Sequence, residues 1–243
     1  MFNPIHKNVL ITGGSKGIGR AIAKEFIRLG CKVTIIDIVK PNFINHNFIR
    51  CDLSNHLNVL DCLEKFHLKN KFFGILINCA AVTLPGNAEN YSLDNWNKSI
   101  NINLSATFLI CREIGKKMIQ NKFPGSIINI TSIGAELGFE NNPAYGASKG
   151  AVKQMSKALA VEWGKYGIRV NNLVPGYTNT PMNKKSWNNL KLRKKRSDNT
   201  SLGRWASTKE MVGPVIFLAS SASSYITGTD LIVDGGWTVK GMK

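Results

Sequence analysis

Three residues of the chain combine the types and the spacing of a proton-transfer site. Tyr145 and Lys149 stand four residues apart, and Ser132 precedes the tyrosine by thirteen residues. On a helix, residues four apart share one face, so the phenol and the ammonium would lie together. A free tyrosine has a pKa of about 10, and a neighbouring ammonium lowers that pKa by favouring the phenolate. The three residues could therefore exchange a proton with an alcohol or carbonyl oxygen that Ser132 holds.

A glycine-rich turn near the start of the chain, TGGSKGIG at 12–19, could hold a phosphate. Gly13, Gly17 and Gly19 follow an apolar run and open an amphipathic one. Glycines at such a junction allow a tight turn, and they let a pyrophosphate approach the N-terminus of the following helix. The turn therefore predicts a dinucleotide site, although its spacing differs from GxGxxG.

Acidic residues after the next two apolar runs indicate which dinucleotide is bound. Asp37 could accept hydrogen bonds from the adenosine ribose and would repel a 2′-phosphate, which favours NAD(H). Lys16 and Lys40 leave NADP(H) open, since either cation could pair with that phosphate. Asp52 could contact the adenine edge. It could equally cap a helix, as could Ser54.

Short apolar runs alternate with amphipathic segments along the whole chain, and they predict the elements that position these residues. The expected strands are 8–14, 31–38, 47–53, 72–81, 125–132, 167–176 and 227–236. The expected helices are 17–30, a helix ending at 66, 92–121, 143–163 and 208–220. Strands that are almost wholly apolar suit a parallel sheet covered on both faces. The pattern predicts an α/β fold, a doubly wound, Rossmann-like parallel sheet with right-handed crossovers.

The chain shows no linker or repeat, so we expect a single domain over 1–243. Its least regular segment is 177–207, between the sixth strand and the last helix, and connections of this length are often lids. Ser132 and Tyr145 would lie beyond the carboxyl ends of the strands, where open α/β sheets bind their ligands.

Basic residues dominate the charge of the chain, with a formal net charge of +17. Such a balance is typical of proteins that bind nucleic acid, acidic membranes or anionic small molecules. Lysine, asparagine and isoleucine are all frequent and share AT-rich codons, so genome composition explains much of the charge, and we expect no nucleic-acid partner. The densest basic run, 184–196, is either a solvated face or a surface that attracts an anionic substrate.

Cysteine usage and hydropathy bound the setting. The five cysteines show no metal-binding spacing, and they indicate reduced thiols in a cytoplasmic protein. No apolar run approaches the roughly 20 residues that span a membrane. We therefore expect no metal and no membrane partner.

The chain resembles the short-chain dehydrogenase/reductase family over essentially its whole length. The motifs that carry the resemblance are TGGSKGIG, Asp52, NCAA at 78–81, Asn103 in NINL, Ser132, YGASK at 145–149, PGYTNTPM at 175–182 and ITGTDLIVDGGW. The resemblance implies that Tyr145 is the acid/base, that Lys149 lowers its pKa and binds the nicotinamide ribose, and that Asn103 anchors a water in the proton relay. The expected cofactor-binding residues are Gly13, Ser15, Lys16, Gly17, Ile18, Gly19, Asp37, Asp52, Leu53, Asn78, Ala80, Tyr145, Lys149, Pro175, Gly176, Thr178 and Thr180.

Three positions depart from the family's pattern. Cys79 and Ala81 replace Asn and Gly of the usual NNAG, which bears on the fine geometry of that loop. Thr178 stands where an aliphatic residue is common, but the contact expected there is largely through the backbone.

Similar segments elsewhere in the chain point to a substrate class. GFENNPAYGASKGAV, LGRW and SSYITGTDLIVDGGW look like gluconate, polyol and other sugar dehydrogenases, and are also similar to 3-oxoacyl-carrier-protein reductases. We expect an NAD-dependent oxidoreductase of a secondary alcohol or ketone on a sugar, sugar acid or polyol, with the 3-oxoacyl reductase as the alternative. Glu140, Tyr177 and Trp187 would face this small-molecule, anionic or neutral substrate.

Two further expectations concern class and assembly. A non-catalytic nucleotide- or nucleic-acid-binding regulator could use the same scaffold, because fold does not fix function. Such a regulator could have lost the catalytic residues, whereas this chain keeps Ser132, Tyr145, Lys149 and Asn103 together. The family commonly forms homotetramers, and the apolar last strand with its DGGW tail suits a subunit contact.

Overall fold

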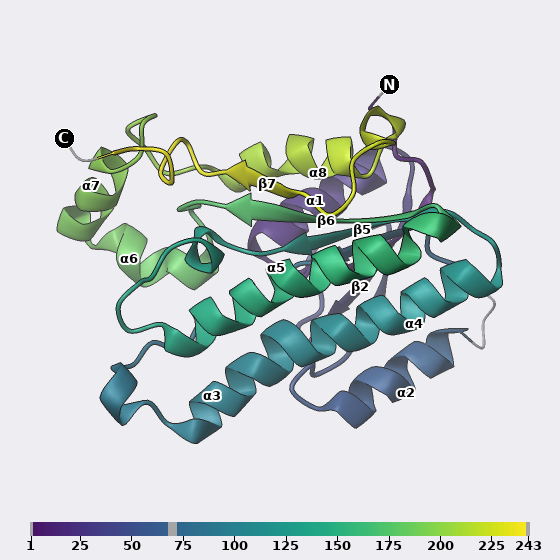
Figure 1. Cartoon of the computed structure of the whole chain (residues 1–243), viewed down its shortest axis with the longest axis horizontal. Helices are drawn as coiled ribbons and strands as arrows, with labels where there is room; N and C mark the ends of the chain where they lie inside the picture. The colour runs from purple at the N-terminus through teal and green to yellow at the C-terminus, as the bar shows by residue number, and fades with distance from the viewer. Residues whose placement is uncertain (1, 68–71, 242–243) are drawn as a thin grey trace.

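Seven parallel strands form the centre of the fold, in the order β3-β2-β1-β4-β5-β6-β7 (Figure 1). The computed structural model describes residues 2–67 and 72–241. The strands are β1 (Asn8–Thr12), β2 (Lys32–Asp37), β3 (His46–Arg50), β4 (Ile75–Asn78), β5 (Gly125–Ile130), β6 (Ile168–Pro175) and β7 (Asp230–Val233). The prediction of a single doubly wound α/β domain is confirmed.

Helices cover both faces of the sheet. They are α1 (Gly17–Arg28), α2 (His56–His67), α3 (Leu93–Ile100), α4 (Ala106–Gln120), α5 (Pro143–Trp163), α6 (Lys184–Asn188), α7 (Leu190–Asp198) and α8 (Val212–Leu218). Single turns join them: the 3-10 turns η1 (Ala88–Asn90), η3 (Ile133–Ala135), η4 (Gly164–Tyr166), η5 (Pro181–Asn183), η6 (Thr208–Met211) and η7 (Ser221–Ser223), and the π turn η2 (Asn101–Ser105).

The alternation of side chains along the strands builds two core layers. In β1, Val9 and Ile11 pack with Phe26 of α1 and with α8, while Leu10 packs with α2, α4 and α5 on the other face. All of these strand side chains are essentially inaccessible to solvent. The apolar strands therefore read as continuous hydrophobic runs because both of their faces are covered.

The last crossover departs from the expected right-handed pattern. α5 joins β5 to β6 on the face of α2 and α4, whereas α8 joins β6 to β7 on the face of α1. Both connections move one strand in the same direction, yet they use opposite faces. The β6–β7 connection thus has the opposite hand, a rare arrangement among parallel crossovers. It lets α8 pack on the core residues Ile22, Ala23 and Phe26 of α1.

Several expected elements differ in detail. The expected helix 92–121 is a helical run whose hydrogen-bond ladder widens into the π turn η2, and π turns often occur at functional sites. The expected strand 72–81 is shorter, and the expected helix 208–220 begins with the 3-10 turn η6. The segment 177–207 is not irregular, because it contains η5, α6 and α7.

Register brings the functional loops to one edge of the sheet. Thr12, Asn78 and Asn129 are neighbours across β1, β4 and β5, and Asn172 of β6 continues the row. The loops that follow these strands therefore leave the sheet side by side. The strand order reverses between β1 and β4, which is where a doubly wound sheet opens a crevice for its ligand.

Candidate active site

Ser132 and Tyr145 face each other across a glycine. Ser132 follows β5, and its Oγ accepts a hydrogen bond of 3.0 Å from the backbone of Gly134. A Cβ added to Gly134 would lie 3.5 Å from Ser132 Oγ and 3.6 Å from Tyr145 Cε1. A hydrogen bond with Ser132 lowers the pKa of Tyr145, but burial of the phenol raises that pKa more. The two hydroxyls thus share one small space above the end of β5.

Lys149 is buried one helical turn beyond Tyr145. Its Nζ donates a hydrogen bond of 2.7 Å to the carbonyl oxygen of Ile130 and lies 5.9 Å from the centre of the Tyr145 ring. Burial lowers the pKa of Lys149 to about 8. The expected lowering of the Tyr145 pKa by this ammonium is not found, because burial disfavours charge on both groups and the ammonium is held by the end of β5.

Asn103 joins the loop after β4 to the catalytic helix. Its amide oxygen accepts a hydrogen bond of 2.8 Å from Val82 N, and its amide nitrogen donates to the Val82 carbonyl and to Ser148 Oγ, each at 3.0 Å. The Ser148 hydroxyl in turn donates to the Tyr145 carbonyl at 2.8 Å. The side chain therefore links Val82 to Ser148 and, through Ser148, to Tyr145, and its role in anchoring a water stays a prediction.

The phosphate loop depends on close backbone contact. Gly13 has a φ of +67°, and a Cβ there would lie 2.7 Å from the backbone of Ala80. A Cβ on Gly19 would lie 2.3 Å from the carbonyl oxygen of Gly13. The turn between them carries buried Ser15, exposed Lys16 and half-buried Ile18. Only glycine fits at these two positions, so the loop forms a cradle in front of α1.

Asp37 is tied to this cradle. One carboxylate oxygen accepts a hydrogen bond of 3.1 Å from Ser15 N, and the other accepts one of 3.2 Å from Val39 N. A carboxylate has more acceptor sites than these two donors fill. Asp37 is thus fixed at the end of β2 with capacity left for a ribose hydroxyl.

The turn after β3 settles the question of the helix cap. Asp52 is exposed and accepts a hydrogen bond of 2.9 Å from Ser54 N, while Leu53 is buried. The cap of α2 is Asn55, whose side-chain oxygen accepts from Leu57 N and Asn58 N. The expected alternative of Asp52 or Ser54 as the cap is therefore wrong.

Asn78 and Ala80 belong to the scaffold under the crevice. The Asn78 amide donates to Asn129 Oδ1 at 2.8 Å and to Cys111 Sγ at 3.2 Å, so the side chain lies within the core. The backbone of Ala80 donates to Thr12 Oγ1 at 3.2 Å. Both residues hold the loop after β4 against the phosphate loop, and the contact of Asn78 with a cofactor stays a prediction.

The loop after β6 closes over the phosphate loop. Pro175 ends β6, and Gly176 packs so closely on Asp234 that a Cβ would lie 2.7 Å from its Cα. Thr178 is buried and donates to the Gly176 carbonyl at 3.1 Å. A Cβ on Gly17 would lie 3.6 Å from the Thr180 side chain. The chain between Gly176 and Thr180 thus faces the cradle.

The whole chain compares with one known family and its solved structures. A family model described as Enoyl-(Acyl carrier protein) reductase matches residues 13–238. D-threitol dehydrogenase of Mycolicibacterium smegmatis is 34% identical over 96% of this chain and 94% of its own. The chain belongs to the short-chain dehydrogenase/reductase family. It is an NAD(P)-dependent oxidoreductase that acts on CH–OH groups.

Two solved structures of dehydrogenases share this fold closely. 4-Hydroxyisoleucine dehydrogenase complexed with NADH is 31% identical and matches with a TM-score of 0.94 over 97% of this chain and 100% of its own. A gluconate 5-dehydrogenase from Burkholderia cenocepacia, in complex with NADP and tartrate, is 29% identical and matches with a TM-score of 0.92 over 99% and 98% of the two chains. The family thus binds either nicotinamide cofactor.

The cradle of this dehydrogenase fits a nicotinamide dinucleotide. Gly13 and Gly19 leave no room for side chains, so backbone N–H groups at the start of α1 are open to a pyrophosphate. Asp37 would hold the adenosine ribose, and Lys149 would reach the nicotinamide ribose. When bound, the nicotinamide supplies a hydride acceptor or donor.

Aromatic residues gather around Tyr177, in the loop after β6. The Tyr177 ring centre lies 6.2 Å from that of Phe139, 5.0 Å from that of Trp205 and 4.9 Å from that of Trp237. Trp187 of α6 lies 5.5 Å from Trp205. We call these five residues the aromatic cluster. Tyr177 and Trp187 were predicted individually from the sequence. Phe139, Trp205 and Trp237 were not, although they stand in the quoted segments GFENNPAYGASKGAV, LGRW and DGGW.

Glu140 follows Phe139 of the cluster in sequence, and its contact with a substrate stays a prediction. Its side chain is exposed, and its carbonyl accepts a hydrogen bond of 3.3 Å from the Asn142 amide. The acidic residue of the same loop that makes a defined contact is Glu136, which pairs with Lys153 of α5 at 2.5 Å. Lys153 also lies 3.5 Å from Asp230, so this ion pair fixes the loop after β5 to the catalytic helix.

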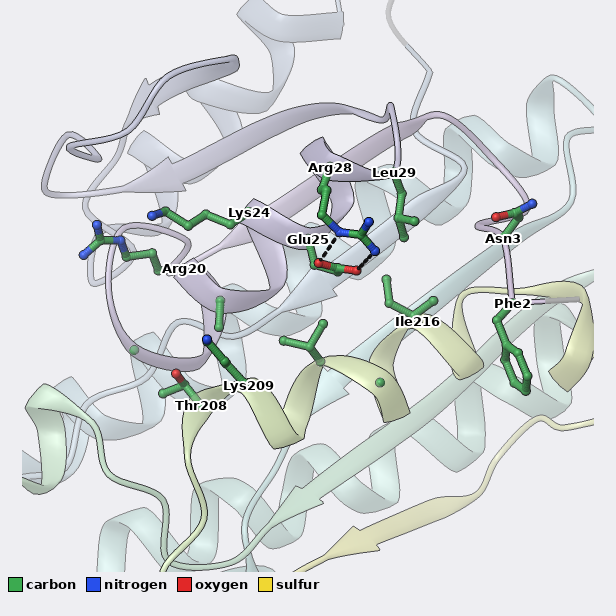
Figure 2. Close-up of a pocket in the computed structure, with 14 residues that line it drawn as sticks. Phe2, Asn3, Arg20, Lys24, Glu25, Arg28, Leu29, Thr208, Lys209 and Ile216 are labelled. Atoms are coloured by element: carbon green, nitrogen blue, oxygen red, sulfur yellow. Dashed lines mark hydrogen bonds and ion pairs between the residues drawn. The ribbon is translucent and has the colours of Figure 1, made fainter.

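A large groove lies away from the reacting residues. It has a volume of about 1120 Å³ and runs between α1 and the η6–α8 segment, with Phe2 and Asn3 at one end (Figure 2). Arg28 and Glu25 pair within it at 2.6 Å. Neither Ser132, Tyr145 nor Lys149 lines the groove, so it is not the substrate site.

Two structural features are absent from the described residues: a membrane-spanning helix and a metal-binding cluster. Over 2–67 and 72–241, no helix is long and apolar enough to cross a membrane, and no cluster of His, Cys, Asp and Glu could hold a metal ion.

Proposed function

We propose that this short-chain dehydrogenase interconverts a secondary alcohol and a ketone on a sugar, sugar acid or polyol, with NAD(H) as the preferred cofactor. The observation that carries the proposal is the hydrogen bond between the Ser132 and Tyr145 side chains beside Gly134, with Lys149 buried one helical turn away. The similarity to D-threitol dehydrogenase and to a gluconate 5-dehydrogenase supports the substrate class.

The residues of the chain divide the work as follows. Ser132 holds the substrate oxygen by a hydrogen bond. Tyr145 takes the hydroxyl proton during oxidation and returns it to the carbonyl oxygen during reduction. Charged Lys149 favours the phenolate form of Tyr145, and a polar nicotinamide ribose beside it would offset the burial that opposes that charge. Asn103 and Ser148 keep Tyr145 in place through the backbone.

A substrate panel tests the proposal. Threitol, glucitol, gluconate and a 3-oxoacyl thioester mimic are incubated with each nicotinamide cofactor, and the absorbance of the reduced cofactor is followed. We expect turnover of at least one polyol or sugar acid. Turnover of the thioester mimic alone would replace the proposal with acyl-carrier-protein chemistry, which the description of the matching family model favours.

Replacing Asp37 with alanine should weaken NAD(H) more than NADP(H). The variant loses an acceptor for the ribose hydroxyls, but it also loses the charge that repels a 2′-phosphate. We expect the ratio of the two dissociation constants to shift about 10- to 100-fold, since one hydrogen bond to a charged group contributes about 1.5–3 kcal/mol. Fluorescence titration with NADH and NADPH measures both constants. An equal change for both cofactors would show that Asp37 does not select between them.

The proposal extends to assembly and location. β7 is the edge of the sheet, and Ile232 of β7, Tyr225 and Val239 are exposed around it. An exposed apolar edge supports a homotetramer built through this strand, and sedimentation equilibrium measures its mass. The five free thiols suit the reducing conditions of the cytoplasm.

A further inference from the structure

Helix α7 carries two kinds of basic residue on two different faces. Lys191, Lys194 and Lys195 are exposed and border an outer hollow of about 530 Å³, where Lys194 pairs with Asp198 at 2.9 Å. Arg193 and Arg196 stand three residues apart and therefore share another face. That face meets the aromatic cluster. The basic run expected to attract a substrate is thus divided, and only its arginines turn inward.

Arg196 is the cation closest to the centre of the cluster. Its guanidinium carbon lies 4.4 Å from the centre of the Tyr177 ring and 5.7 Å from that of Trp205. Burial raises the pKa of the Tyr177 phenol, and the charge of Arg196 offsets part of that effect. The Arg193 guanidinium carbon instead lies 4.8 Å from the centre of the Trp187 ring.

Among the described residues, the Arg196 guanidinium has no carboxylate partner. It is half-buried, and within residues 2–67 and 72–241 no carboxylate lies within ion-pair distance of it. Stacking on Tyr177 occupies the flat face of a guanidinium and leaves its in-plane N–H groups as donors. A partly desolvated guanidinium with free donors binds a carboxylate strongly and in a defined orientation.

The rings connect Arg196 to the reacting centre. Tyr177 lies next to Phe139, and Phe139 Cδ2 lies 3.6 Å from the Cβ position of Gly134, the point on which Ser132 and Tyr145 converge. The rings of Tyr177 and Phe139 therefore lie between Arg196 and the hydroxyls of Ser132 and Tyr145. An extended substrate with its alcohol at Tyr145 would direct its far end along these rings.

We propose that Arg196 binds the carboxylate of the substrate, so that the enzyme prefers sugar acids over neutral polyols. The inference rests on the proposed function, because it assumes that the reacting alcohol lies at Tyr145. It assigns the anion selectivity of the lid to one inward residue, and it gives the exposed lysines of α7 no part in binding.

The test compares Arg196→Met with Lys195→Met, which removes the same charge from the outer face. D-Gluconate and D-glucitol form a matched pair, since they differ only in the carboxylate. For Arg196→Met we expect the KM for gluconate to rise about 10- to 100-fold, the range of one charge-assisted hydrogen bond, and the KM for glucitol to stay within twofold. Lys195→Met should match the wild type with both, and Arg196→Lys should fall between.

A binding measurement separates this inference from the proposed function. Trp187, Trp205 and Trp237 make the cluster's fluorescence sensitive to a nearby ligand, so tartrate is titrated into the protein with NAD present and no turnover. Quenching that weakens at least tenfold in Arg196→Met, but not in Lys195→Met, supports the inference even if no sugar is a substrate. Equal quenching in all variants, or none in the wild type, overturns it. An equal rise in KM for gluconate and glucitol would show that Arg196 only packs the lid.

Discussion

Replacing Tyr145 with phenylalanine should lower kcat by about 100- to 10,000-fold, the range that one positioned acid/base contributes. The phenylalanine ring can occupy the same buried position beside Gly134, because only the hydroxyl is lost. We therefore expect the dissociation constant of NAD to stay within about twofold, which NADH fluorescence measures independently of turnover.

Tyr166→Phe is the matched control for this substitution. Tyr166 is partly exposed in η4, beyond the far end of α5, and makes a cation–π contact only with Lys165. Its loss of a hydroxyl should leave kcat unchanged. A Tyr145→Phe enzyme that keeps more than a tenth of the wild-type turnover would sink the assignment of Tyr145 as the acid/base.

Replacing Gly19 with alanine should strongly weaken cofactor binding. The added Cβ would lie 2.3 Å from the carbonyl oxygen and 2.9 Å from the carbonyl carbon of Gly13, both of which are backbone atoms. The loop must then move away from α1, at a cost of about 1–3 kcal/mol for an overpacked site. We expect the dissociation constant of NAD to rise more than tenfold and the melting temperature of the empty protein to fall.

Gly213→Ala provides the comparison for the phosphate loop. Gly213 lies inside α8, and a Cβ there meets nothing within 4 Å. Alanine is the better helix former by about 1 kcal/mol, so this variant should bind NAD normally and melt no lower than the wild type. Normal NAD binding by Gly19→Ala would contradict the cradle as described.

The parts of the fold that the sequence predicted depend on local pattern. Buried strands such as β4 and β5 are continuous apolar runs, and α5 begins at Pro143, so these elements and the Ser132–Tyr145–Lys149 spacing could be recognised without coordinates. The ends of elements were less certain, because tertiary contacts decide them. The expected strand 72–81 ends already at Asn78, because the backbone N–H groups of Cys79 and Ala80 donate hydrogen bonds to Thr12 Oγ1 instead.

The rest required the three-dimensional structure. The opposite hand of the β6–β7 connection follows from the face of the sheet that α8 covers. The sequence of that helix does not indicate which face this is. Arg196 is one of five basic residues in α7, and only the packing of α7 on Tyr177 distinguishes it from the lysines. The pKa of Tyr145 depends on how far the site excludes water, which spacing alone does not report.

A chain of hydrogen-bonded polar side chains connects the elements below the crevice. From Asn129 the hydrogen bonds run to Ser156 at 2.8 Å, on to Asn172 at 2.7 Å, and from Asn172 to Asp230 at 2.7 Å. This chain links β5, α5, β6 and β7 below the reacting residues. Buried polar groups that are fully bonded define one arrangement of the core.

The packing of α1 against α8 has a consequence for folding during synthesis on the ribosome. α1 is made before α8, and this later helix covers the apolar side of α1, which includes Ile22 and Phe26. The nascent chain must therefore expose this apolar surface of α1 until α8 has been synthesised. Uncovered apolar surface of this kind promotes aggregation and is what chaperones bind. Shortened chains that end before Val212 should accordingly be recovered as aggregates or bound to chaperones, whatever the quality of their dinucleotide-binding half.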